Sequence, residues 1–160
     1  MTNGKAEKTT YQEGDIFVVP LDDGRQVLGV VARRGRNKTR DFVLGYFFKQ
    51  GLDESPSLKA ANSILAIQFG NLCLKNKKWP IIGKVDPWIR EEWPIPKFYR
   101  DSFREFGGAN FFQHIHYDDE LNEVGEQRIP IAQNEEIQGY SRDAFYDALA
   151  VEIRLAELLA

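Results

Sequence analysis

The chain has 160 residues, of which 42% are hydrophobic and 28% are charged, and its formal net charge is −3. This length fits one globular domain, because folding at this size buries roughly 70% of the surface that the unfolded chain exposes. The single cysteine, Cys73, excludes an internal disulfide bond, and its neighbours Leu72 and Leu74 predict a buried, inert thiol.

The two halves of the chain differ in charge. Residues 1–80 hold 13 Lys and Arg against 8 Asp and Glu, whereas residues 81–160 hold 8 against 16. Such asymmetry indicates either a charged partner for one face or merely solvated loops. No apolar stretch fits a signal peptide or a membrane span, so we expect a cytoplasmic protein. We expect residues 1–10 to form a flexible arm and residues 11–160 to form a single domain.

Residues 14–31, GDIFVVPLDDGRQVLGVV, predict a β-hairpin whose arms are apolar on both faces. The run Ile16–Leu21 is too short for a helix and rich in β-branched residues. Asp22-Asp23-Gly24 supplies the turn, since Gly24 can adopt a positive φ, and the chain returns over Arg25–Ala32.

More strands are expected after the hairpin. Asp41–Lys49 alternates apolar side chains on both faces, and three strands without a polar face predict a sheet covered on both sides or a partly closed barrel. Gln50–Lys59 predicts a loop. Later strands are predicted at Ile64–Phe69, Trp79–Val85 and Phe111–Tyr117, the last followed by a turn at Asp118-Asp119. Four prolines make the region up to Tyr99 extended and irregular: Pro80, Pro87, Pro94 and Pro96.

The last predicted element is a helix. Ser141 can cap a helix that runs from about Arg142 to Leu159. Its apolar side should lie across one face of the sheet. That side is formed by Phe145, Leu149, Ile153, Ala156 and Leu159, with Ala148 and Leu155 beside them. The sequence therefore predicts an α+β fold: a curled, mostly antiparallel sheet or a partly closed barrel, with a C-terminal α-helix packed on it.

Two polar features interrupt these apolar patterns. Glu152 projects into the apolar side of the predicted helix. It could serve there as an acid/base group, as a contact for a basic partner, or as a structural ion-pair or hydrogen-bond acceptor. His114 and His116 share one strand face with Asp118, which would suit a divalent metal ion or simply a half-exposed strand. Nucleophile elbows, phosphate-binding loops and dinucleotide fingerprints are missing, so we predict neither catalysis nor a metal or cofactor.

Basic residues form two tracts in the first half of the chain. On an SH3-like β-barrel these tracts would suit phosphate contacts, so a nucleic-acid-binding module is the alternative function. The acidic pI of about 5.5 disfavours nucleic acid, and solvated loop tips that protect strand edges are the simpler explanation. The tracts are Arg33, Arg34, Arg36, Lys38 and Arg40 at a predicted hairpin tip, and Lys75, Lys77 and Lys78 before Trp79.

The opening GDIF-VPL-DG hairpin, its apolar return strand, and WPIIG with its proline-rich sequel together resemble the immunity protein 26 family of bacterial polymorphic-toxin systems. The resemblance extends from about Asp15 to Arg100. It implies a non-enzymatic protein that binds and neutralises a cognate toxin by occluding the toxin's active site or a nearby exosite. The family-motif residues, taken as structural, are Gly14, Asp15, Pro20, Gly24, Trp79, Pro80 and Gly83.

Acidic and aromatic residues of the second half are the candidates for partner contact. A nuclease toxin would have a basic groove, toward which acidic side chains could steer association by mimicking phosphate. Trp88 and Trp93 would either anchor this partner or close the open end of the sheet core. The predicted partner-binding residues are Trp88, Glu91, Glu92, Trp93, Asp118, Asp119, Glu120, Glu123 and Glu126. A monomer and a homodimer are both compatible with the sequence.

Overall fold

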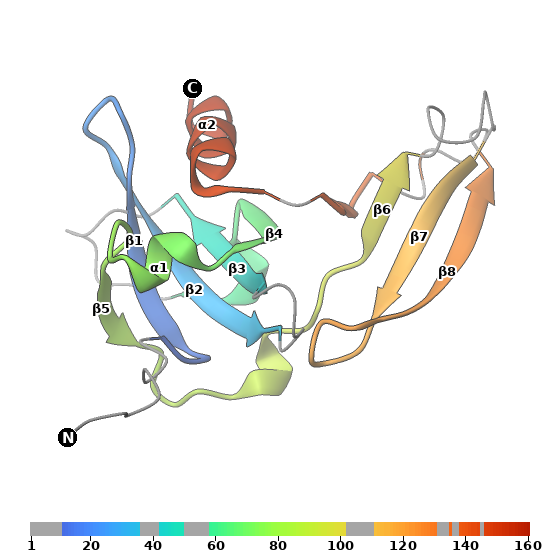
Figure 1. The fold of residues 1–160 in the computed structure, drawn as a ribbon, viewed down its shortest axis with the longest axis horizontal. Helices are drawn as coiled ribbons and strands as arrows, with labels where there is room; N and C mark the ends of the chain where they lie inside the picture. The colour runs from blue at the N-terminus through green and yellow to red at the C-terminus, as the bar shows by residue number, and fades with distance from the viewer. Residues whose placement is uncertain are drawn as a thin grey trace, which may run out of the picture.

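The computed structural model describes residues 11–35, 42–49, 58–101, 111–130, 135, 138–144 and 146–160. The predicted arm over residues 1–10 lies outside these ranges, as do Arg36, Lys38, Arg40 and most of the predicted loop Gln50–Lys59. In the described part, the chain forms two sheets and a C-terminal helix, with short helical turns between strands (Figure 1).

The first sheet contains the hairpin predicted for residues 14–31. β1 (Asp15–Pro20) and β2 (Gln26–Arg34) pair antiparallel, and Gly24 adopts a φ of 90° in their turn. β3 (Phe42–Phe48), β4 (Leu65–Gly70) and β5 (Ile81–Lys84) extend the described sheet in the order β4-β3-β2-β1-β5, with all pairs antiparallel. The hairpin and the three later strands predicted in this region are confirmed.

Both faces of β1 to β4 are largely buried, as their apolar pattern predicts, whereas β5 is mostly exposed. On the inner face, Phe17 stacks on Trp79 with ring centroids 5.7 Å apart. A Cβ atom on Gly29 would lie 2.3 Å from the Phe17 ring, so only glycine leaves room for it. On the outer face, Tyr46 packs edge-on against Trp93 at 5.3 Å. A sheet shielded in this way needs no polar side, which explains why period-2 polarity is absent from its strands.

A second sheet has the order β8-β7-β6-β9 in the described part of the chain. β6 (Phe98–Asp101), β7 (Phe111–Tyr117) and β8 (Glu123–Pro130) are antiparallel neighbours, and β9 (Ser141–Arg142) runs parallel to β6. β7 and the turn that follows it are confirmed. β6 begins in the region predicted to be irregular up to Tyr99, and β8 and β9 lie where no strand was expected.

The C-terminal helix begins later than the sequence predicts. α2 spans Ala148–Leu158, and its N-cap is Asp147, which accepts a hydrogen bond from the Ala150 N–H at 2.8 Å. The predicted cap Ser141 instead starts β9. The predicted start at Arg142 is therefore wrong, because residues 141–142 pair with β6 and complete the second sheet.

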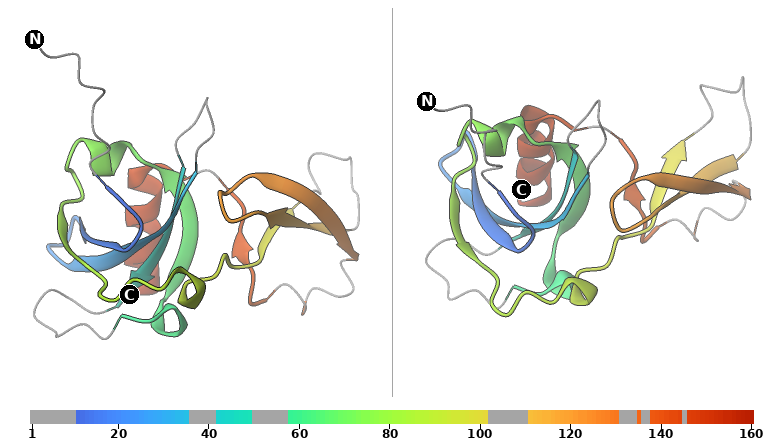
Figure 2. Two further views of the ribbon diagram at one scale, coloured as in Figure 1. Left: turned by 90° about the horizontal axis from the view of Figure 1, so that it is seen from below. Right: turned by 60° about the horizontal axis from the view of Figure 1, so that its bottom comes forward.

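The buried face of α2 also differs from the prediction. Val151, Glu152 and Leu155 are buried, whereas Leu149 and Ile153 are more than half exposed. The prediction is confirmed for Leu155 and wrong for Leu149 and Ile153, and Phe145 lies outside the described ranges. The helix packs beside the inner face of the first sheet, which curls around it (Figure 2). Together these observations confirm the α+β class and the mostly antiparallel sheets.

Two chain crossings join the sheets (Figure 1). Residues 93–98 lead from the 3-10 turn Arg90–Glu92 into β6. Residues 141–147 lead from β9 to α2, and Tyr146 pairs with Phe69 of β4 on the way. The edge strands β4 and β9 consequently lie near each other, between the crossings.

Candidate partner-binding site

A groove of about 640 Å³ lies between the edge of β4 and β9. Its described walls come from segments far apart in the sequence. The chain crossings before β6 and after β9 hold the second sheet next to β4, so residues of both sheets face the groove. The lining comprises residues 63–67 and 138–142, together with Tyr46, Pro96, Tyr99, Tyr146 and Arg154.

The groove is rich in tyrosine and arginine. Tyr99, Tyr140 and Tyr146 line it with Arg142 and Arg154, and its described lining residues include no carboxylate. Tyrosine and arginine are the residue types that, with tryptophan, dominate binding energy at protein interfaces. The arrangement therefore suits recognition of a polypeptide with acidic or aromatic character.

Several contacts hold the groove's side chains in place. The Tyr140 ring lies 4.9 Å from the His114 ring, and Lys97 Nζ lies 5.5 Å from the Tyr140 centroid. Arg154 makes a long contact of 3.4 Å with Glu157, and both side chains are about half exposed. Such an exposed pair contributes little to stability, so the Arg154 guanidinium is available to a partner.

Tyr46 anchors one wall of the groove to the first crossing. Its hydroxyl donates a hydrogen bond to the Pro94 carbonyl. Burial raises the pKa of Tyr46 to about 12, although nearby Arg33 opposes the shift. The phenol therefore stays protonated at neutral pH and acts as a structural donor.

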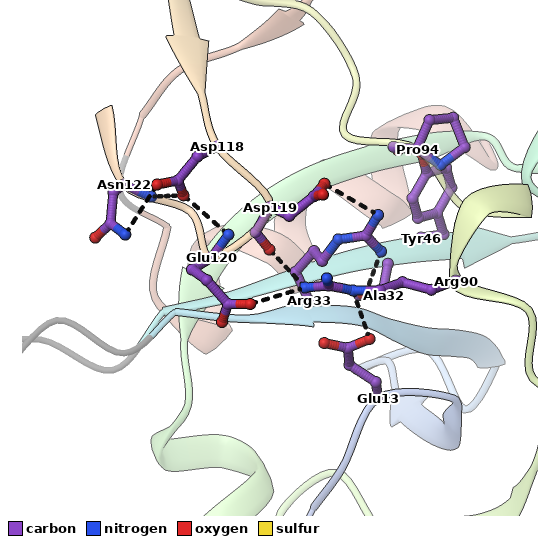
Figure 3. A network of polar contacts seen from close by, with 10 residues as sticks. All are labelled: Glu13, Ala32, Arg33, Tyr46, Arg90, Pro94, Asp118, Asp119, Glu120 and Asn122. Carbon is purple, nitrogen blue, oxygen red and sulfur yellow. Dashed lines mark hydrogen bonds and ion pairs between the residues drawn. The ribbon is translucent and has the colours of Figure 1, made fainter. Parts of the chain in front are cut away.

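The described lining of the groove includes no residue of the predicted acidic turn. The turn lies beside Arg33 of the first sheet and Arg90 (Figure 3). Asp119 Oδ1 lies 3.7 Å from Arg33, and Glu120 lies 3.3 Å from Arg90, which also pairs with Glu13 at 3.0 Å. These contacts connect the β7–β8 turn to β2 and to the start of β1. The turn thus has an internal structural role whether or not it also meets a partner.

Asp118 shapes the acidic turn from within. Its carboxylate accepts hydrogen bonds from the N–H groups of Glu120 and Asn122, each at 2.9 Å. The bonds to Asn122 and Glu120 lower the pKa of Asp118. The other two predicted acids of the hairpin are also engaged: Glu123 pairs with Arg100 at 3.3 Å, and Glu126 accepts from Gln113.

The predicted tryptophans occupy different environments. Trp93 is 2% exposed and contacts Tyr46 and Phe48, so its indole closes the sheet core. Trp88 is half-buried and packs against Trp93 with a tilt of 31° and ring centroids 5.6 Å apart. Glu91 and Glu92, between the two tryptophans in the sequence, are exposed. Among Trp88, Glu91, Glu92 and Trp93, only Trp93 is fully buried, so a partner could reach the other three.

The family-motif residues support the first sheet. Gly14 has a φ of 89°, and a Cβ atom there would lie 3.0 Å from the Trp88 ring. Asp15 accepts a hydrogen bond from the Gln12 N–H at 2.7 Å. The Pro80 carbonyl accepts from the Val18 N–H at 2.9 Å. Pro20, Gly24, Trp79 and Gly83 lie at the end of β1, in the β1–β2 turn, in the inner core and in β5.

The basic tract does not form a solvated hairpin tip at Arg33. Its side chain is 3% exposed, and it donates to the Ala32 carbonyl at 2.7 Å. Burial lowers the pKa of this guanidinium, as does the neighbouring Arg90. The prediction of a solvated loop is therefore wrong for Arg33, because the acidic turn covers it. Lys75, Lys77 and Lys78 are exposed around the end of α1 (Leu72–Lys75).

The reactive residue types have structural surroundings. Cys73 is buried, as predicted, and burial raises the pKa of its thiol to about 12, which disfavours the reactive thiolate. His114 and His116 share one face, with ring centroids 4.1 Å apart. Across the described ranges, no cluster of three or more His, Cys, Asp or Glu suited to a metal ion is found. Glu152 accepts a hydrogen bond from Trp79 Nε1 at 3.0 Å.

Sequence reasoning missed the groove residues Tyr140, Arg142, Tyr146 and Arg154. Their shared site depends on how two sheet edges meet, and a local pattern carries no signal for that. Tyr99 was recognised only as part of an aromatic, proline-rich stretch.

Comparison with known proteins places the chain in a family. None of the described helices is long and apolar enough to cross a membrane. No curated protein and no solved structure matches the chain. The model of one family, described as Immunity protein 26, matches residues 12–104, which span β1 to β6 and more than half of the sequence. The chain therefore belongs to the Immunity protein 26 family.

Proposed function

We propose that this protein binds a cognate bacterial toxin in the cytoplasm and neutralises it by covering the toxin's active site or an adjacent exosite, without catalysing a reaction. Membership of the Immunity protein 26 family supports the immunity function. We place the contact surface at the groove between β4 and β9, because its lining contains several tyrosines together with Arg142 and Arg154.

The groove is a better candidate for the main contact than the acidic turn. Most carboxylates of that turn already pair with arginines or backbone donors of this chain. A toxin that used them would first have to break these contacts, whereas the groove arginines face solvent. Exposed acids such as Glu91 and Glu92 can still assist association at longer range.

The test uses the toxin domain encoded next to this chain. Wild-type protein should form a stable one-to-one complex in size-exclusion chromatography and should protect cells that express the toxin. The double variant Tyr140→Ala with Arg142→Ala should weaken the complex by about tenfold or more and reduce protection, because it removes two groove contacts. Lys75→Ala, an exposed change on α1 outside the groove, is the matched control.

Two outcomes would contradict the proposal. If the toxin domain neither binds nor is neutralised by the wild-type protein, the immunity function toward this toxin fails. If the double variant folds and protects as well as wild type, the groove is not the contact surface.

A further inference from the structure

The outer edge of β4 forms one wall of the groove, and its backbone geometry follows from two observations. β3 and β4 pair in continuous register from Phe42 opposite Gly70 to Phe47 opposite Leu65. At one end, the Gly70 N–H turns away from β3 and donates to the Tyr146 carbonyl at 3.1 Å. Because backbone groups alternate between the two sides of a strand, the N–H groups of Gln68 and Ala66 also point away from β3.

These outward N–H groups face away from β3 beneath neighbouring side chains, since Ala66 is 9% exposed and Gln68 is 6% exposed. The N–H groups of Ala66 and Gln68 make no hydrogen bond to any other described residue. Tyr146 closes the edge only at its Phe69–Gly70 end. Residues 65–67 of this edge line the groove, and in the described sheet β4 is an edge strand.

The two edges of the first sheet differ in how they are protected. β5, at the far edge, has four residues, is preceded by Pro80 and ends at Lys84. Short strands, prolines and lysines at an edge all discourage pairing with another chain. β4 has the sequence LAIQFG, which contains no proline and no charge. An unprotected edge of this kind is a template for a strand from a binding partner.

We propose that an extended segment of the toxin adds to β4 as a further strand and lies in the groove between β4 and β9. Ile64 donates its N–H inward to the Phe47 carbonyl at 2.8 Å, so the available edge is residues 65–68. At roughly 3.3 Å per residue this edge is about 13 Å long, enough for a segment of three or four residues. Arg142 and Arg154 select a segment that carries Asp or Glu, since the described lining is positive. This inference rests on the proposed function and adds the kind of segment that the toxin supplies.

A proline substitution tests the backbone pairing directly. Ala66→Pro removes an outward N–H without removing a bond to β3, a change that edge strands tolerate. The matched control is Lys84→Pro on β5. The Val85 N–H donates inward to the Gly14 carbonyl at 2.8 Å, so the N–H of Lys84 points outward. Ala66→Pro should weaken binding of the toxin domain by about tenfold or more, and Lys84→Pro should leave it within about twofold.

Amide hydrogen exchange on the wild-type complex gives a readout that does not depend on how the variants fold. Addition of the toxin domain should slow exchange at Ala66 and Gln68 and leave Ile82 on β5 unchanged. Charge reversal by Arg142→Glu with Arg154→Glu should weaken the complex, whereas Lys75→Glu should not.

The outcomes separate this inference from the function on which it rests. A complex that forms and protects cells without slowing exchange at Ala66 and Gln68 would overturn strand addition and leave the immunity function standing. If the wild-type protein does not bind the toxin domain at all, both strand addition and the immunity function toward this toxin would be overturned. Full affinity in the charge-reversed variant would overturn the choice of an acidic segment.

Discussion

The indole N–H of Trp79 lies among the aromatic rings of the inner core, where water cannot satisfy it. It donates to Glu152 Oε2 at 3.0 Å, and Lys78 Nζ lies 3.3 Å from the same oxygen. Of the roles that the sequence left open for Glu152, the geometry favours the structural acceptor. A carboxylate on the buried side of a helix is tolerated here because both a donor and a cation reach it.

Substitution of Glu152 should separate hydrogen bonding from charge. Glu152→Ala leaves the Trp79 N–H without an acceptor and should lower the free energy of unfolding by about 1–3 kcal/mol. Glu152→Gln keeps an acceptor oxygen and should lower it by less than the alanine variant does. Urea denaturation followed by tryptophan fluorescence measures both, with exposed Glu157→Ala as a control. Equal losses in the two variants would show that the hydrogen bond from Trp79 is unimportant.

Cys73 provides a pH-dependent prediction. Burial raises the pKa of its thiol to about 12, from about 9 for an ordinary thiol. Between those values the unfolded chain loses the proton first, so this contribution to stability is complete below about pH 9 and falls as the pH rises toward 12. At pH 8, iodoacetamide should therefore label the folded protein far more slowly than the urea-unfolded chain. Equal labelling rates, read by mass spectrometry, would contradict a buried thiol.

At the scale of elements, sequence patterns succeeded where pairing is local. β1, β2 and β3 follow one another along the chain, and Gly24 specifies the turn that joins the first two. Neighbouring strands connected in this way are defined by short-range signals. β6 and β9 are different, because their parallel pairing joins residues about 43 positions apart.

The error in α2 has a physical explanation. Both Ser141 and Asp147 can cap a helix, and no local feature separates them. Tertiary pairing decides, since residues 141–142 complete the second sheet and Tyr146 reaches β4 before the helix can begin. The contact of Glu152 with Trp79 then fixes which face turns inward, leaving Leu149 and Ile153 exposed.

Leu121 in the β7–β8 turn offers a test of both side-chain burial and backbone conformation in this turn. Its φ is 63°, in the left-handed region, and its side chain is 7% exposed among outer-face residues such as Leu44 and Phe98. Leu121→Ala should destabilise the protein by about 2–4 kcal/mol through lost burial. Leu121→Gly should be no less stable than the alanine variant, because glycine adopts this φ without the roughly 1–2 kcal/mol steric cost.

The matched pair lies inside α2. At Leu155, where the backbone is helical, the glycine variant should be about 1 kcal/mol less stable than the alanine variant. Chemical denaturation of all four variants gives the comparison. If glycine is the worse substitution at both positions by a similar margin, the turn does not impose the left-handed conformation on Leu121.

At the scale of the whole molecule, the candidate site could not be predicted from the sequence. Residues 63–67 and 138–142 line one groove only because the two chain crossings bring β4 of the first sheet close to β9 of the second. The sequence did supply the charge asymmetry, but the fold uses part of it internally, in the pairs that Arg33, Arg90 and Arg100 make with the acidic turn. Of these three pairs, only the one between Arg33 and Asp119 joins the two halves, so it brings a positive charge of the first half beside a negative charge of the second.

Glu91 and Glu92 allow electrostatic steering to be tested without disturbing these internal pairs. Both are exposed in the 3-10 turn beside Arg90. If the toxin carries a basic surface, Glu91→Gln with Glu92→Gln should slow association severalfold at low salt and leave dissociation nearly unchanged. The difference should vanish near 1 M salt, where the screening length falls to about 3 Å. Stopped-flow fluorescence with the toxin domain measures both rates.

Asp22→Asn with Asp23→Asn is the control, because it removes the same charge from the β1–β2 turn, far from this site in Figure 1, and should have a smaller effect. Equal slowing by the two pairs would mean that net charge alone, rather than its position, sets the rate.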